Sequence, residues 1–218
     1  SPEDILYILY SSVRTGTPKG VMISKSNVAA NVYGFAKHYA IDENDKFLSW
    51  TPLTHCYGLV IFHLVPLMAG ADQCLLSTKL YMNQPLIWAE TINEYRATRI
   101  GSLPFALKHF NNVYMNSEKN FNWDLSCVDS MFLGGESVSQ ALYKEFCNEV
   151  NAYGFSIDKV YPLYGLTEAT IMLTANRLGK HARTFEITND KLVIGDKVHC
   201  KELADGETAD NVFLEMGT

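Results

Sequence analysis

Short apolar runs alternate with longer amphipathic segments along most of this chain, and this alternation restricts the possible folds more than any other feature. Apolar runs that suit buried strands occupy residues 5–10, 21–23, 46–50, 73–76, 99–102, 128–133 and 159–163. Helical segments are predicted at residues 27–39, 58–68, 84–95, 105–115 and 138–150. Strands that alternate with helices predict a layered α/β domain, with helices flanking a mostly parallel sheet.

The sequence changes character after residue 175. The part from Asn176 onward is polar and charge-mixed, and it holds short alternating runs at residues 184–188, 191–194 and 212–214. Alternation over so few residues is typical of short strands with one buried face. We therefore expect a β-rich appendage that follows the α/β part.

Composition restricts the function classes. Hydrophobic residues make up 47% of the 218 residues and charged residues 19%, which is enough apolar surface for a substantial core. The net charge of −6, without a run of Lys or Arg, argues against a nucleic-acid partner. The longest apolar stretch, residues 57–71, contains His63 and Pro66 and is shorter than the roughly 20 residues of a membrane span, so no span is expected.

The cysteines and the two ends of the chain bear on its context. Five cysteines form an odd set without a CxxC spacing, which argues against a disulfide framework and a thiolate zinc site. We therefore expect a reducing, cytoplasmic location. The first residues lack an initiator Met and a secretory signal, and both ends look cut.

Residues 11–20 read Ser-Ser-Val-Arg-Thr-Gly-Thr-Pro-Lys-Gly and follow the first predicted strand. Hydroxyls, glycines and one ammonium group suit a polyphosphate, because backbone N–H groups and short side chains can converge on its oxygens. A Walker loop is excluded, since Lys19 is followed by Gly20 rather than by Ser or Thr. An ordinary surface hairpin would have a similar composition.

Two later segments carry further candidate residues. His55 stands just before an apolar helical segment, where it could border a carboxylate or simply form structural hydrogen bonds. The run Tyr164-Gly-Leu-Thr167-Glu168 places an aromatic ring, a hydroxyl and a carboxylate at the end of a predicted strand. These groups suit stacking on a base, contact with phosphate and binding of Mg²⁺, although a plain strand-to-helix turn would also explain them.

Together, in this order, the three segments resemble the core motifs of the acyl-adenylate-forming superfamily. Within that superfamily the chain is most similar to the fatty-acyl-AMP ligases. Gly134-Gly135-Glu136 and residues 85–88 also support this resemblance. The resemblance implies that residues 1–175 are part of an AMP-binding large domain, the N-terminal one in that family. Residues 176–218 then hold the insertion typical of those ligases, associated with poor use of coenzyme A, and the start of the next segment.

The resemblance also implies a role for each matching residue, with ATP and Mg²⁺ as reactant and metal. Lys19, His55, Thr167 and Glu168 would be the catalytic set, with His55 at the carboxylate and Glu168 on the metal. The β- and γ-phosphates would lie on Ser12, Thr15, Gly16 and Lys19, and Thr167 would touch the α-phosphate. The adenine site would be formed by Gly134, Gly135, Glu136 and Tyr164. The acyl pocket would be walled by Gly101, Ser102, Pro104 and Phe105.

Two departures from the family pattern leave alternatives open. Val13 and Arg14 stand where the family has Gly and then Ser or Thr, and a β-branched residue disfavours the backbone conformation that Gly allows there. The family's ribose-binding Asp and its small C-terminal domain with a catalytic Lys would lie beyond Thr218, so we expect the 218 residues alone to be inactive.

The leading interpretation is part of an enzyme that activates a fatty or other carboxylic acid as acyl-AMP for an acyl carrier protein. The alternatives are a non-catalytic nucleotide- or acyl-binding module with a degenerate phosphate loop, an acyl-coenzyme A synthetase, and a structural domain of a larger synthetase.

Overall fold

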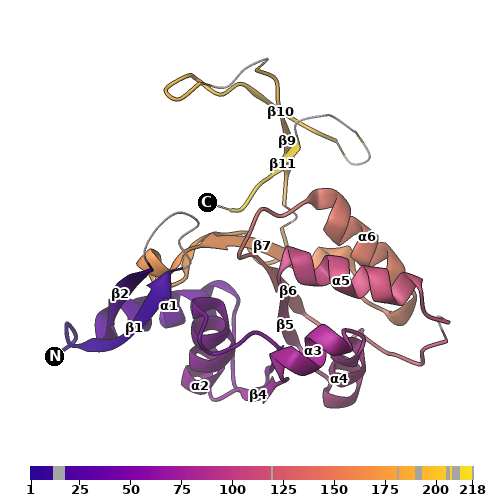
Figure 1. Ribbon diagram of the computed structural model, residues 1–218, viewed down its shortest axis with the longest axis horizontal. Helices are drawn as coiled ribbons and strands as arrows, with labels where there is room; N and C mark the ends of the chain where they lie inside the picture. Colours follow the sequence, from indigo (N-terminus) through magenta and orange to yellow (C-terminus); the bar gives the residue numbers. More distant parts are fainter. Residues whose placement is uncertain are drawn as a thin grey trace.

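A six-stranded sheet forms the centre of the protein, whose structure is a computed structural model (Figure 1). The structure describes residues 1–11, 18–118, 120–180, 182–189, 193–204, 207 and 212–217. The strand order is β4-β3-β5-β6-β7-β8; the first five strands run parallel, and β8 is antiparallel to β7. The strands are β3 (Lys46–Ser49), β4 (Asp72–Leu75), β5 (Arg99–Ser102), β6 (Ser130–Leu133), β7 (Val160–Gly165) and β8 (Met172–Ala175). The predicted mostly parallel sheet is confirmed.

Helices cover both faces of this sheet. One face carries α1 (Lys25–His38), the π-helix η1 (Tyr57–Leu64) and α2 (Val65–Ala69); the other carries α3 (Thr78–Asn83), α4 (Ile87–Tyr95), α5 (Pro104–Met115) and α6 (Gln140–Val150). Neighbouring side chains of one strand enter different cores, because strand residues alternate between faces: Phe47 packs with α1, and Leu48 packs with α4. The result is the predicted three-layered α/β domain. Within the described residues, no helix has the length and apolar character that a membrane span requires.

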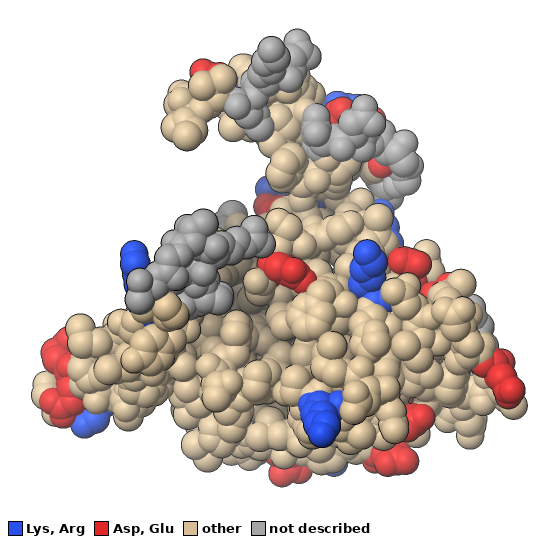
Figure 2. Space-filling view, in the orientation of Figure 1, with Lys and Arg blue, Asp and Glu red and all other residues tan. Residues whose placement is uncertain are grey.

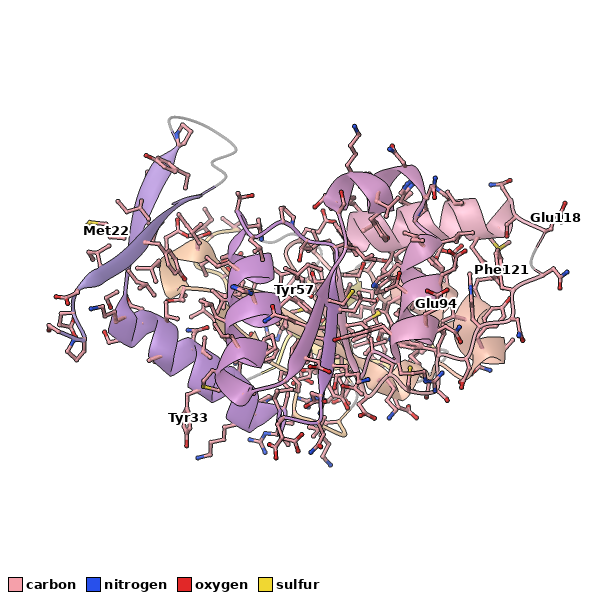
Figure 3. The ribbon with its side chains drawn as sticks, turned by 90° about the horizontal axis from the view of Figure 1, so that it is seen from below. Met22, Tyr33, Tyr57, Glu94, Glu118 and Phe121 are labelled. Carbon is pink, nitrogen blue, oxygen red and sulfur yellow. The ribbon has the colours of Figure 1, made fainter. Side chains whose placement is uncertain are left out.

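A separate two-stranded hairpin precedes α1. It pairs β1 (Ile5–Ser11) with β2 (Lys19–Ser24) in antiparallel register. Ile23 is buried against the helical core, whereas Met22 is 66% exposed and projects away from the molecule (Figure 3). The Ser24 side chain caps α1, since its hydroxyl accepts the Asn27 N–H and the Asn27 side chain accepts the Ser24 N–H.

A second, smaller sheet stands above the body of the molecule (Figure 1). It holds β9 (Thr184–Ile187), β10 (Cys200–Glu202) and β11 (Val212–Leu214), all antiparallel, in the order β10-β9-β11. The Arg183 guanidinium lies 2.6 Å from the Glu215 carboxylate, and Gln140 of α6 is hydrogen-bonded to Thr184. The predicted β-rich appendage is therefore present; the Arg183–Glu215 pair lies within it, and the Gln140–Thr184 bond joins it to the α/β part.

Several local predictions were incomplete. The apolar segment predicted as one helix at residues 58–68 is divided into η1 and α2, with Pro66 in the first turn of α2. A proline is tolerated there because the N–H groups of a first helical turn have no partner within the helix. The short elements α3, β8 and β10 were not predicted, nor were the 3₁₀ turns η2 (Asn151–Tyr153), η3 (Ile157–Lys159) and η4 (Thr167–Ala169). The run predicted at residues 191–194 lies partly outside the described residues.

Candidate functional site

The candidate residues follow the carboxyl ends of parallel strands. His55 comes after β3, Phe105 after β5, Glu136 after β6, and Thr167 with Glu168 after β7. Carboxyl ends of parallel strands meet at one edge of a sheet, and ligands of open α/β sheets bind in the crevice outside that edge. The chain order of strands and loops therefore places four separate segments around one region.

A cavity of about 880 Å³ lies at this edge, beside the end of β7. It is lined by Gly135, Glu136 and Tyr164, which are three of the four residues assigned to adenine by the resemblance. The Tyr164 side chain is 52% exposed, so part of its ring is accessible to a ligand. The fourth residue, Gly134, is buried and does not line the cavity.

Gly135 has a conformation that requires glycine. Its φ of +88° lies in the region that L side chains rarely adopt, and a Cβ there would be 2.7 Å from Leu103 Cδ2. Without a side chain, this residue contributes bare backbone to the cavity wall. That arrangement permits close approach of a flat or charged ligand.

Glu136 connects the turn after β6 to the segment after β5. Its Oε1 accepts the backbone N–H of Phe105 at 2.7 Å, at the first turn of α5. A carboxylate there satisfies an N–H without a helical partner and complements the positive end of the helix dipole. Of the residues assigned to the acyl pocket, Gly101, Ser102 and Pro104 are buried, and Phe105 is 46% exposed with its ring against Trp50.

His55 is held by the start of η1. Its Nδ1 accepts the backbone N–H of Tyr57 at 3.1 Å. Nδ1 is therefore the unprotonated nitrogen, and in the neutral ring Nε2 carries the hydrogen. Desolvation by neighbouring groups lowers the pKa of His55 below 6.5, which favours this neutral form. Tyr57 itself lies in the middle of the molecule (Figure 3), where its hydroxyl donates to the Phe132 carbonyl at 2.7 Å.

The His55 segment and the Thr167–Glu168 segment touch. The Thr167 hydroxyl donates to the buried Cys56 Sγ at 3.6 Å. Burial raises the pKa of Cys56, and the bond from Thr167 opposes that shift, so the side chain is a neutral thiol near pH 7. Two segments more than a hundred residues apart are thus joined by a direct side-chain contact.

Glu168 is exposed, and it forms no ion pair with the described residues. Within that same part of the chain, no group of three or more His, Cys, Asp or Glu side chains could hold a metal ion. Magnesium is commonly bound by one or two carboxylates together with substrate phosphates and water. The single carboxylate of Glu168 fits that mode and does not fit an all-protein metal cage.

The hairpin supplies the remaining candidate. Lys19 begins β2 opposite Ser11, and its side chain is exposed. Strand β1 packs against η4, so the hairpin lies next to Thr167. Ser12, Thr15 and Gly16, together with the divergent Val13 and Arg14, lie outside the described residues.

Comparison with known proteins agrees with this arrangement. The family described as AMP-binding enzyme matches residues 1–209. The chain belongs to the AMP-binding enzyme family. This finding confirms the resemblance drawn from the three motifs.

Relatives of this chain include a protein named as a fatty-acid ligase and one named as an acyl-CoA synthetase. It is 30% identical over 190 residues to the medium-chain-fatty-acid acyl-carrier-protein ligase JamA of Moorena producens, covering 87% of this chain and 32% of that protein. It is 32% identical over 194 residues to a putative acyl-CoA synthetase of Caulobacter vibrioides, covering 88% and 34%. The chain spans about a third of the length of these relatives.

The fold of this AMP-binding chain also matches a solved structure. The fatty acyl-adenylate ligase of L. pneumophila, in complex with acyl adenylate and pyrophosphate, superposes with a TM-score of 0.89 at 29% identity. The match covers 99% of this chain and 37% of that one. It confirms the layered fold and the likeness to fatty-acyl-AMP ligases.

The sequence did not indicate every residue that lines this cavity. Part of the wall comes from β11, through Val212, Phe213 and Leu214, and from Met216 just after it, and Lys144 of α6 contributes a positive charge. The alternation at residues 212–214 indicated a strand, but nothing in it indicated which part of the molecule that strand would meet. Figure 2 shows the Lys and Arg side chains of this face scattered over it rather than gathered in one large patch.

Proposed function

We propose that the protein containing this chain is an ATP-dependent ligase that converts a fatty carboxylate to acyl-AMP and pyrophosphate. The observation that supports it best is the cavity at the carboxyl end of the sheet, which is lined by Gly135, Glu136 and Tyr164, with Thr167 following Tyr164 three residues along the chain. The exposed ring of Tyr164 suits an adenine base, and the bare backbone at Gly135 suits close approach of its edge.

In this reaction a carboxylate oxygen attacks the α-phosphorus of ATP. The new bond joins that oxygen to phosphorus, and the bond between the α-phosphorus and the bridging oxygen of the β-phosphate breaks. Pyrophosphate leaves with that electron pair. Such chemistry needs positioning and charge stabilisation rather than a protein nucleophile. The Thr167 hydroxyl would contact the α-phosphate, and Lys19, with Ser12, Thr15 and Gly16, would hold the departing phosphates.

His55 would border the reacting carboxylate. Because its Nδ1 accepts the Tyr57 N–H, the neutral ring offers the Nε2–H as a donor to a carboxylate oxygen. A neutral donor orients the carboxylate while leaving its negative charge available for attack. The acyl chain would continue along Phe105, the exposed residue at the start of α5.

Magnesium is the metal that this donor set fits. Glu168 would hold it together with oxygens of ATP, and the bound ion would neutralise part of the phosphate charge. Orientation of the nucleotide would then depend on Lys19, Thr167 and Tyr164.

The acceptor of the acyl group is proposed from the relatives. JamA is named as an acyl-carrier-protein ligase, and we propose that an acyl carrier protein also receives the product here. The competing acceptor is coenzyme A, which the name of the Caulobacter vibrioides relative favours. Supplying each acceptor to the same acyl-AMP and separating the products by chromatography would decide between them.

Pyrophosphate exchange tests the adenylation step. The natural protein that contains this chain should exchange labelled pyrophosphate into ATP when given Mg²⁺ and fatty acids of increasing length. Glu168→Gln should remove most of the exchange, whereas Glu118→Gln, at an exposed site at the far end of the body from the hairpin (Figure 3), should leave it unchanged. Absence of exchange with every acid tested would contradict the proposal.

A binding module without turnover is the second candidate, and Val13 with Arg14 is the observation that favours it. Such a module would bind ATP in the cavity and show no exchange. Val13→Gly combined with Arg14→Ser restores the family pattern. If exchange appeared only in this double variant, the module would be the correct assignment for the natural sequence.

A further inference from the structure

The turn that carries Thr167 and Glu168 holds a β-branched residue in an unfavourable backbone conformation. Thr170 has a φ of +71° and a ψ of −58°, and its side chain is only 4% exposed. The Ile171 N–H donates to the Ala169 carbonyl at 2.9 Å, which closes a three-residue γ-turn around Thr170. Positive φ is rare for β-branched residues, and such strain persists only where the surroundings enforce it.

The turn is also pressed onto the end of β7. A Cβ at Gly165 would lie 1.5 Å from the Ile171 carbonyl oxygen, so only glycine permits this close approach. Thr167 and Glu168 therefore occupy the tip of a tight loop between Gly165 and Met172. A small relaxation of that loop would change the direction of both side chains.

One side chain from a distant helix holds both sides of the strained residue. Asn31 of α1 donates from Nδ2 to the Ala169 carbonyl at 3.2 Å, and its Oδ1 accepts the Met172 N–H at 3.0 Å. These two backbone groups lie on either side of Thr170. The amide of Asn31 thus bridges Ala169, at the start of the γ-turn, and Met172, the residue just after its end.

The helix itself does not depend on this amide. Helix α1 buries Val28, Val32 and Phe35, and at its end His38 Nε2 and the Tyr39 hydroxyl lie 3.0 and 3.1 Å from the Asn176 carbonyl oxygen. The contacts of Asn31 are therefore additional to those that attach α1, and they act on the turn.

We propose that Asn31 is a positioning residue that maintains the strained turn at Thr170 and thereby aims Thr167 and Glu168 at the nucleotide. The catalytic consequence rests on the proposed function. The two hydrogen bonds from Asn31 to the turn, which we call the clamp, do not depend on any reaction. The segment is therefore attached at two points: Thr167 donates to Cys56, and Asn31 binds Ala169 and Met172.

The test compares Asn31→Ala and Asn31→Asp with Tyr33→Ala in the natural protein that contains this chain. Tyr33 lies on the same helix, is 63% exposed and points away from the core (Figure 3). Asn31→Ala should lower kcat for pyrophosphate exchange roughly 10- to 30-fold through loss of two hydrogen bonds, with a smaller change in KM for the fatty acid. Asn31→Asp, which keeps the acceptor for Met172, should retain more activity, and Tyr33→Ala should match the wild type.

Hydrogen exchange makes failure of the clamp distinguishable from failure of the proposed function. In Asn31→Ala, peptides that cover residues 165–175 should exchange at least about tenfold faster, and peptides that cover β6 should not change. Adding Thr170→Gly should restore part of the lost kcat, because glycine adopts a positive φ without support. Unchanged exchange in Asn31→Ala would overturn the clamp. Faster exchange with unaltered kinetics, in a protein that does catalyse the reaction, would overturn its positioning role.

Discussion

The two ends of the central sheet use polar side chains in opposite ways. At the amino ends of β3, β5 and β6, Asp45, Arg99 and Ser130 are all buried and bonded to one another: Arg99 Nε lies 2.6 Å from Asp45, and Nη1 lies 2.7 Å from Ser130. At the carboxyl ends, His55, Glu136 and Glu168 are exposed. The same sheet thus has one end where polar side chains satisfy each other in the interior and one end where they are exposed at the surface.

This difference separates stability from function. A buried ion pair whose lone pairs and donors are satisfied within the protein has no capacity left for a ligand, and removal of one partner leaves an isolated buried charge. Loss of an exposed group leaves no buried charge without a partner, so it affects folding little. Substitutions at the two ends should therefore change different measurements.

The largest effect should come from the amino end. Arg99→Ala should lower the free energy of unfolding by about 3 to 5 kcal/mol, because Asp45 would remain buried without its partner. Denaturant titration of the chain measures this. The matched control is Arg96→Ala, which breaks an ion pair with Asp124 whose two side chains are 43% and 58% exposed. That change should be below about 1 kcal/mol, and equal losses for both variants would remove the distinction.

A smaller effect is expected at the carboxyl end, and in binding rather than in stability. Tyr164→Ala should weaken ATP binding by about 1 to 3 kcal/mol, the usual value of stacking between a base and an aromatic side chain. Calorimetric titration with Mg·ATP measures it, and Tyr164→Phe should retain the affinity. A loss of stability as large as that of Arg99→Ala would show that Tyr164 belongs to the structural class instead.

Glu136 lies between the two classes, because it lines the cavity and also bonds to the first turn of α5. Glu136→Ala should lower the free energy of unfolding by about 1 kcal/mol, as for other lost helix caps. Glu136→Gln keeps an acceptor for the Phe105 N–H and should lose less. Thermal unfolding of both variants tests this, and no difference from the wild type would mean that the bond to Phe105 contributes nothing.

The smallest effect concerns the pH dependence at His55. The pKa of His55 is about 6.5 in the unfolded chain and lower in the folded protein. Between the folded pKa and about pH 6.5, the unfolded chain therefore binds more protons than the folded one. The free energy of unfolding should then rise with pH across this window and be fully developed above it. His55→Gln should flatten that part of the profile, measured by melting temperature from pH 5 to 7.5. A profile that is identical in both proteins would contradict the pKa shift.

The sequence predicts much of the fold that separates the two ends of the sheet, because the strands and helices come from long periodic segments. The apolar runs at residues 46–50, 99–102 and 128–133 are followed by helices, and such βα units place all strand ends at one edge. The meeting of the His55 and Thr167–Glu168 segments follows from that geometry. The resemblance of the motifs to the family then indicated a role for each matching residue.

The remainder depends on contacts between distant residues, which no local pattern encodes. The hydrogen bond from Asn31 to Ala169 joins residues 138 positions apart. β8 is only four residues long and returns antiparallel, so it shows no periodic signal. The uniform apolar character of residues 57–64 also fails to distinguish a π-helix from an α-helix.

The position of β11 has a consequence for how the lining of the cavity can be altered. One wall belongs to the ends of β6 and β7, and the opposite wall belongs to the small sheet through Val212, Phe213 and Leu214. The chain enters and leaves that sheet near Asn176 and Glu215, where the Asn176 side chain donates to the Glu215 carbonyl at 3.4 Å. Because β11 lies outside the six-stranded sheet, a substitution at Val212 or Phe213 would change the lining of the cavity while every residue of the six-stranded sheet stayed the same.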